Sequence, residues 1–204
     1  MQVLDNNAIA QMEQRFRAAF INSLWGFRPL ALIGTVDQQQ RTNLAIFNSL
    51  VHLGANPPLF GMVIRPDSVE RHTLENIREK KEFTVNLVGK DFVDAAHQTS
   101  ARYPKEVSEF EATGLEIEWK EGVEVPFVKK SNIQIHAQLV EEHNLAINGT
   151  EFLIAKVNTV FMAATYVGAD GFVNHLLAHT AAGSGLDAYY APELIVRLPY
   201  AKPK

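Results

Sequence analysis

The two longest alternating stretches of the chain place the strongest limit on its fold. NIQIHAQLVEE, residues 132–142, alternates apolar and polar side chains, and TEFLIAKVNTVFM, residues 150–162, alternates again after the turn sequence HNLAING. A period of two is the pattern of a strand with one buried face, and so short a connection joins antiparallel neighbours. We therefore expect one long β-hairpin in the second half of the chain.

Four shorter apolar runs predict further strands. They are LALIGTV (30–36), NLAIFNSLVHL (43–53), LFGMVI (59–64) and EFTVNLV (82–88). Each run is short and most of them are bounded by Pro or polar turn residues, as strands are. Most connections are too short for parallel crossovers, so we expect a mainly β protein built as an antiparallel barrel.

A few helices are expected around this barrel. Apolar residues spaced along 9–20 predict a helix that opens the chain, and 91–99 predicts another with Asp91 as its cap. Thr73 is expected to cap a compact helix over 73–81, because its hydroxyl can accept a backbone N–H. A further helical turn is expected near 107–110, and the C-terminal tail is expected to be irregular.

Composition narrows the classes of partner. The chain has 204 residues, a formal charge of −4 at pH 7 and no cysteine. Its length and its 47% hydrophobic content suit a single domain over residues 1–204. Surfaces that bind many phosphates carry a basic excess, so we expect no nucleic-acid or anionic-membrane surface, and any anion site must be local. The absence of cysteine excludes disulfides, thiolate metal sites and a thiol nucleophile.

The N-terminal segment shows no export pattern. It lacks a basic segment followed by an apolar stretch, and Asp5 and Glu13 interrupt it. No apolar run reaches the ~20 residues that a membrane helix requires. We therefore expect a cytoplasmic protein that does not enter a membrane.

RPDSVERHTLENI, residues 65–77, is a candidate anion site. Arg65, Arg71 and His72 stand ahead of the predicted helix start at Thr73. A helix N-terminus offers unpaired N–H groups and a positive dipole end, so a phosphate is favoured there. The alternative is an ordinary solvated turn whose charges are cancelled by three acids, Asp67, Glu70 and Glu75.

The remaining motifs do not indicate a specific functional site. HLLAH, residues 175–179, would place two imidazoles on one helical face, but Leu176 stands where a zinc protease needs Glu. The glycines of 183–185 do not follow a clear strand, which favours a hinge over a phosphate loop. His136 lies inside an alternating strand and is expected to be structural. We expect no metal site, and no catalytic side chain is assigned.

Five stretches in series resemble flavin reductase-like proteins with the FMN-binding split-barrel fold. They are RPLALIGTV (28–36), NLAIFNSL (43–50), PPLFGMVI (57–64), SVERHTLENI (68–77) and EFTVNLV (82–88), and the tail LDAYYAPELIVRLPYAKP resembles the C-terminus of that family. The resemblance covers most of the chain from about residue 20 onward. It implies a six-stranded Greek-key split barrel, normally a homodimer, with FMN at the interface between subunits.

The resemblance also implies which residues contact the cofactor. The contacts to the flavin ring or ribityl chain would be Asn43, Leu44, Ala45, Phe47, Asn48 and Ser49. Arg71 and Thr73 match the phosphate-binding positions of the family, and Arg65 is placed for the same phosphate. His72 stands where the family usually has an acid. By residue type alone, Ala45 and Phe47 fit equally well as alternate core positions of a strand.

The implied function is that of an FMN-binding oxidoreductase. NAD(P)H or another donor would pass hydride to the flavin, which then reduces an acceptor, so the cofactor carries the chemistry. One alternative is a non-catalytic FMN carrier or sensor. Another is a split barrel that binds a different ligand, such as haem or pyridoxal phosphate.

Overall fold

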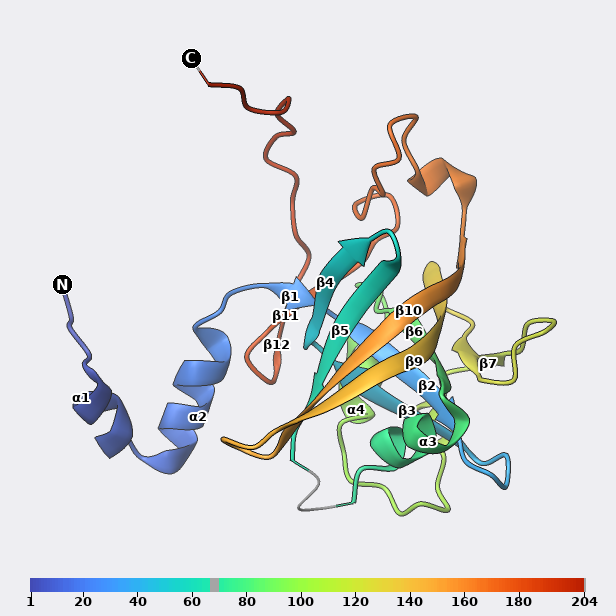
Figure 1. Ribbon diagram of the computed structural model, residues 1–204, viewed down its shortest axis with the longest axis horizontal. Coiled ribbons are helices and arrows are strands. Elements are labelled where there is room, and N and C mark those ends of the chain that lie inside the picture. The colour runs from blue at the N-terminus through green and yellow to red at the C-terminus, as the bar shows by residue number, and fades with distance from the viewer. Residues whose placement is uncertain (67–69, 204) are drawn as a thin grey trace.

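The main sheet is antiparallel throughout and has seven strands within residues 1–66 and 70–203, the part of the chain that the computed structural model describes. Its strands are β2 (Ala31–Val36), β3 (Thr42–Phe47), β4 (Leu50–Ala55), β5 (Pro58–Ile64), β6 (Glu82–Leu87), β9 (Ile133–Leu145) and β10 (Thr150–Met162). Their order across the sheet is β3-β2-β6-β9-β10-β5-β4 (Figure 1). The expected mainly antiparallel β fold with a few helices is confirmed.

The predicted long hairpin is formed by β9 and β10. Thr150 pairs with Leu145 beside the turn, and Met162 pairs with Ile133 at the far end. Gly149 takes a left-handed φ of +69° in this turn, a backbone conformation that glycine adopts without steric cost. Two register shifts interrupt the ladder, and such irregularities bend a strand and increase its twist. The hairpin therefore curves across the sheet.

Strands β3 and β4 are consecutive in sequence but lie at opposite edges of the sheet order. The predicted single return over 43–53 is wrong in this respect, because the chain breaks at Asn48 and Ser49 and changes partner. β3 pairs with β2, whereas β4 pairs with β5. Only two residues join the two edges, so the sheet must curl until its edges approach each other there. The break also explains why seven strands are found where the resemblance implies six.

The core lies on both faces of β2. Ala31 and Ile33 belong to one apolar cluster, which also contains Phe83 and two residues of α3. Leu32 belongs to a second cluster, which α4 and α5 help to enclose. All six residues of β2 are buried as a result. A strand covered on both faces reads as a continuous apolar run, which is why this strand was predictable.

Three short helices cover the sheet, and their starts differ from the predictions. They are α3 (His72–Lys80), α4 (Val93–Gln98) and α5 (Glu109–Thr113). Arg71, not Thr73, occupies the N-cap position of α3, and its side chain makes no capping hydrogen bond. Phe92, whose ring is buried in the second cluster, replaces Asp91 at the N-cap of α4, and the Asp91 carboxylate pairs with Lys130 at 3.2 Å instead. No described helix is long and apolar enough to cross a bilayer.

The predicted N-terminal helix is divided into α1 (Asn6–Gln11) and α2 (Gln14–Ser23). Met12 is extended, and the Glu13 carboxylate accepts hydrogen bonds from the backbone N–H groups of Arg15 and Phe16 at 2.8 and 2.9 Å. This N-cap starts a second helix where the apolar spacing predicted one continuous helix. None of the described residues in either helix is buried, so the predicted apolar stripe does not face a core within this chain.

Both ends of the chain extend away from the barrel (Figure 1). A small sheet of β1 (Arg28–Pro29), β11 (Ala182–Ser184) and β12 (Ala188–Tyr190) joins them to it. Residues 191–203 have no regular structure, as expected. The remaining elements are β7 (Ile117–Glu118), β8 (Phe127–Val128) and the 3₁₀ helix η1 (Ala164–Tyr166). Residues 175–179 form a turn, so the two histidines of HLLAH do not lie on one helical face.

Candidate functional site

Three arginines gather at the start of α3. Arg71 stands at the N-cap of the helix, Arg65 follows the last residue of β5, and Arg102 lies in the loop after α4. Burial and the nearby charges of Arg65 and Arg102 lower the pKa of Arg71. No carboxylate of the described residues lies within ion-pair distance of these three side chains. We call this group the arginine corner, and its uncompensated charge favours an anion.

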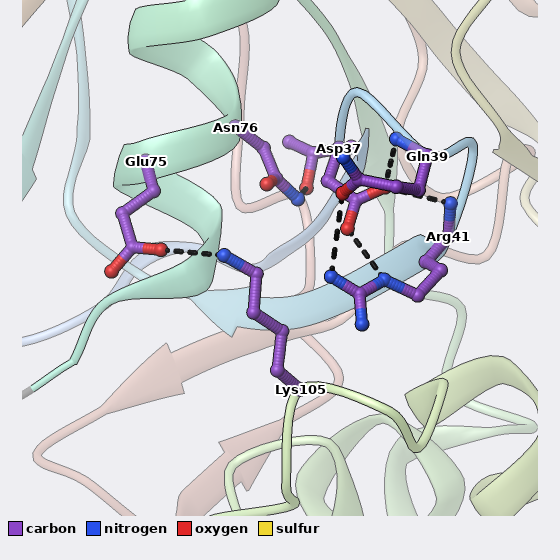
Figure 2. A network of polar contacts seen from close by, with 7 residues as sticks. Asp37, Gln39, Arg41, Glu75, Asn76 and Lys105 are labelled. Carbon is purple, nitrogen blue, oxygen red and sulfur yellow. Dashed lines mark hydrogen bonds and ion pairs between the residues drawn. The ribbon is translucent and has the colours of Figure 1, made fainter.

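The acids expected to cancel this charge are engaged elsewhere or are not described. Glu75, in the first turn of α3, pairs with Lys105 at 3.0 Å, and Figure 2 shows the two side chains facing each other. Glu70 lies 3.6 Å from His72, and Asp67 falls outside the described residues. In the same view Arg41 folds back onto Asp37, with 2.7 Å between the guanidinium and the carboxylate. The described acids therefore leave the corner positive.

His72 sits beside the arginine corner with unused hydrogen-bonding capacity. Its Nε2 atom is buried and has no hydrogen-bond partner, because the 3.6 Å to Glu70 is too long for one. Glu109, on α5, is near enough to feel the charge of His72. Burial raises the pKa of Glu109, while the backbone N–H of Leu44, which donates to it at 2.8 Å, and His72 oppose that rise.

Asn43 and Thr73 are in direct contact. The side-chain nitrogen of Asn43 donates to the Thr73 hydroxyl oxygen at 3.0 Å and to the Thr35 hydroxyl oxygen at 3.1 Å. Asn43 is 8% exposed and Thr73 is 7% exposed. Asn43, the first of the predicted cofactor-binding residues on β3, is therefore hydrogen-bonded to the first turn of α3.

The other predicted flavin-contacting residues lie along β3, further from the arginine corner. Leu44 is buried in the second cluster, whereas Ala45 and Phe47 are partly buried. The Asn48 amide donates to the carbonyl of Gly185 at 2.9 Å, and the Ser49 hydroxyl donates to the carbonyl of Val63 at 2.6 Å. At ~3.3 Å per residue, Asn43 and Asn48 are roughly 17 Å apart along the strand. The predicted residues therefore form an elongated track with the arginine corner at one end.

An apolar cleft of about 370 Å³ lies elsewhere. It is lined by Leu87 and by residues of the segments 27–30, 172–176, 180–182 and 192–194. None of the ten predicted cofactor residues lines this cleft. Within the described ranges, no group of three or more His, Asp or Glu side chains is placed to hold a metal ion.

Sequence reasoning missed Arg102, Glu109 and Asn76. Arg102 stands 31 positions beyond Arg71 at the start of a charged stretch, and nothing local distinguishes it from a surface arginine. Glu109 looks like either of the two acids on α5, although only its carboxylate reaches Leu44. Asn76 is the exception, because a polar residue between the buried Leu74 and Ile77 on a short helix signals an internal hydrogen bond.

Comparison with known proteins identifies the family of the chain. Residues 27–174 match the family described as flavin reductase like domain. A split-barrel protein from Shewanella frigidimarina NCIMB 400, provisionally assigned as a flavin reductase, is 49% identical, with a TM-score of 0.95 over 98% of this chain and 100% of that chain. An FMN-binding protein from Thermus thermophilus, solved with bound 1-cyclohex-2-enone, is 18% identical, with a TM-score of 0.71 over 87% and 93% of the two chains. That second likeness shows the fold alone.

A curated relative from Halalkalibacterium halodurans, whose function is unassigned, is 33% identical over 138 residues. The match covers 64% of this chain and 65% of the relative, which is less than two thirds of either. The family match, in contrast, spans well over half of the chain and includes the residues from β2 to the loop after η1. The chain therefore belongs to the flavin reductase-like family of FMN-binding split barrels.

Proposed function

We propose that the protein is an FMN-binding oxidoreductase whose arginine corner holds the FMN phosphate. The observation that carries this proposal is the set of three guanidinium groups at the start of α3 with no described carboxylate in reach. A phosphate satisfies such a group, because each charge-assisted hydrogen bond to it contributes about 1.5–3 kcal/mol. The backbone N–H groups of the first turn of α3 and the Thr73 hydroxyl add further donors.

The flavin ring and ribityl chain would then lie along β3. The track from Asn43 to Ser49 offers polar groups at its far end, where the Asn48 and Ser49 side chains meet the segments at Gly185 and Val63. Phe47 contributes a partly exposed apolar surface between the two ends. Mixed polar and apolar contacts of this kind suit a ring with one apolar face and a hydrogen-bonding edge.

The protein itself would bind and orient the cofactor. When bound, the flavin supplies the redox chemistry, accepting hydride from NAD(P)H or another donor and reducing a small-molecule acceptor. The arginine corner would fix the phosphate end, and Asn48 and Ser49 would fix the opposite end. No side chain of the chain is required as a nucleophile or as an acid.

We also propose that the active form is a homodimer with FMN at the interface. The N-terminal segment and the tail carry large apolar side chains that are exposed in the single chain, including Phe16 at 61%, Trp25 at 71% and Ile195 at 96% exposure. Large apolar side chains left exposed in a single chain favour burial against another protein surface. A second copy of the chain would bury these residues and close the flavin track from outside.

Two measurements test the proposed function. The purified protein incubated with FMN should retain one flavin per chain after gel filtration. The visible absorbance of the eluted protein measures the bound flavin. It should then oxidise NADH or NADPH in the presence of an artificial acceptor. Retention of FMN without turnover with either nucleotide would favour the carrier or sensor, and failure to retain FMN would exclude both flavin functions.

A further inference from the structure

A buried polar cluster lies directly behind the arginine corner. It consists of Thr35 from β2, Asn43 from β3, and Thr73 and Asn76 from α3, and we call it the Thr35 cluster. All four residues are buried, and Thr35 is fully so. The Thr35 hydroxyl oxygen accepts from the amide nitrogens of Asn43 and Asn76, each at 3.1 Å. Figure 2 shows Asn76 projecting from α3 towards the strands. The cluster thereby ties the first turn of α3 to two strands.

The hydrogen bonds in this cluster have a direction. An amide NH₂ group has two hydrogens and only donates, and Asn43 uses one on Thr35 and the other on Thr73. Thr73 therefore acts as the acceptor in its contact with Asn43. A hydroxyl has a single hydrogen, so the hydrogen of Thr73 remains available to a different group.

Thr35 maintains this arrangement. It receives the second hydrogen of Asn43 and also the hydrogen of Asn76, so two donors converge on one buried oxygen. Without that oxygen, a buried amide hydrogen of Asn43 would lack a partner, and the amide would be free to rotate and present its oxygen to Thr73. Thr73 would then donate its hydrogen to Asn43 and would have none left for a ligand.

We propose that the Thr35 cluster holds the Thr73 hydroxyl as a hydrogen-bond donor towards the arginine corner, with Thr35 as the positioning residue. This inference rests on the proposed function, and it deepens it. The corner then presents only donors, from three arginines and one hydroxyl. A group that only accepts hydrogen bonds, such as the phosphate of FMN, is therefore preferred over a neutral hydroxyl at the same place.

The consequence is a selectivity that depends on residues remote from the ligand. Riboflavin has the same ring and ribityl chain as FMN but ends in a hydroxyl group. Loss of the Thr73 donor should weaken FMN binding roughly tenfold, the low end of the range for a charge-assisted hydrogen bond. Riboflavin binding should change little. A purely structural role for Thr35 would lower both affinities together.

The experiment compares the dissociation constants of FMN and riboflavin for the wild type, Thr35→Val and Thr35→Ser, measured by quenching of flavin fluorescence. Thr35→Val keeps the shape of the side chain and removes the oxygen, so its FMN-to-riboflavin preference should fall roughly tenfold. Thr35→Ser retains the oxygen and should restore the preference. Thr35→Ala removes the same oxygen with a smaller side chain, so it tests the cluster if Thr35→Val does not fold.

The outcomes separate this inference from the proposed function. If the wild type binds FMN no better than riboflavin, the proposed phosphate site at the arginine corner is wrong. A wild type with a clear FMN preference, which a folded Thr35→Val or Thr35→Ala variant retains in full, would overturn the role of the cluster alone. Reduced preference in the valine variant with recovery in the serine variant supports both.

Discussion

The barrel and the two chain ends use similar apolar residues in opposite ways. Phe83, on β6, is fully buried and meets the ring of Phe60 edge-on at 6.1 Å. Phe16, on α2, is 61% exposed and contacts no core cluster. The barrel is therefore packed by contacts within one chain, whereas the ends leave large apolar side chains uncovered in the single chain.

The largest expected effect tests the barrel half of this comparison. Phe83→Ala should lower the free energy of unfolding by about 3–5 kcal/mol, because it leaves a cavity in the first cluster. Phe16→Ala should change it by less than about 0.5 kcal/mol when the protein is dilute enough to be monomeric. Urea denaturation followed by circular dichroism measures both. Similar losses for the two variants would mean that α2 packs on its own barrel.

The second prediction tests the chain ends. The wild type should sediment as a species of twice the 22.8 kDa chain mass. Trp25→Ser should weaken the association by roughly 2 kcal/mol, as a buried aromatic residue at an interface does.

The matched control uses the other tryptophan, Trp119, which directly follows β7 in the chain and is 53% exposed. Figure 1 shows β7 on the opposite side of the molecule from the N-terminal helices. Trp119→Ser should leave the dissociation constant of the dimer unchanged. A monomeric wild type, or an equal effect of the two substitutions in sedimentation equilibrium, would contradict the assignment of the ends to a partner chain.

The third prediction concerns Arg102, which is distant from Arg71 in the sequence and reaches the arginine corner only in the folded chain. Arg102→Ala should weaken FMN binding by about 1.5 kcal/mol, or roughly tenfold, because it removes one of three guanidinium groups. Arg197→Ala is the control, since Arg197 pairs with Asp170 in the C-terminal region. Equal affinities of the two variants for FMN, measured by isothermal titration calorimetry, would place Arg102 outside the site.

The smallest expected effect is a pH dependence inside the barrel. Burial raises the pKa of Glu109 above the ordinary value of 4.5, so the folded chain binds this proton more tightly than the unfolded chain does. The Glu109 contribution to stability is therefore greatest at or below pH 4.5 and decreases as pH rises through the folded-state pKa.

Glu109→Gln keeps an oxygen for the Leu44 N–H and has no proton to lose in this range. The variant should gain stability relative to the wild type between pH 5 and pH 7.5, by about 1 kcal/mol or less. Glu111→Gln, on the same helix but exposed, should show no such change. Urea unfolding at both pH values measures the difference in unfolding free energy between Glu109→Gln and the wild type. If that difference is the same at pH 5 and pH 7.5, Glu109 ionises in the folded protein as it does in the unfolded chain.

Features with a local cause were predictable from the sequence. The β9–β10 hairpin follows from alternation, and β2 follows from a dense apolar run that is buried on both faces. The position of Arg71 at the start of α3 follows from the short helical pattern after it. Each of these features is set by neighbouring residues, so their spacing alone carries the information.

Features that depend on distant contacts were not predictable. Arg102 joins Arg71 only because the loop after α4 returns to α3, and Thr73 gives up the N-cap role because Asn43 occupies its hydroxyl oxygen. The break at Asn48 is set by a change of partner strand, which leaves no mark in the apolar pattern of 43–53. In each case tertiary contacts override a local preference.

The central claim is that the arginine corner binds the phosphate of FMN, and a fluorescence titration of three proteins with FMN and riboflavin tests it most directly. The wild type and Lys120→Ala, whose lysine pairs with Glu118 at 3.0 Å, should bind FMN at least roughly tenfold more tightly than riboflavin. Arg71→Ala should lose that preference. Equal FMN dissociation constants for Arg71→Ala and Lys120→Ala would contradict the account.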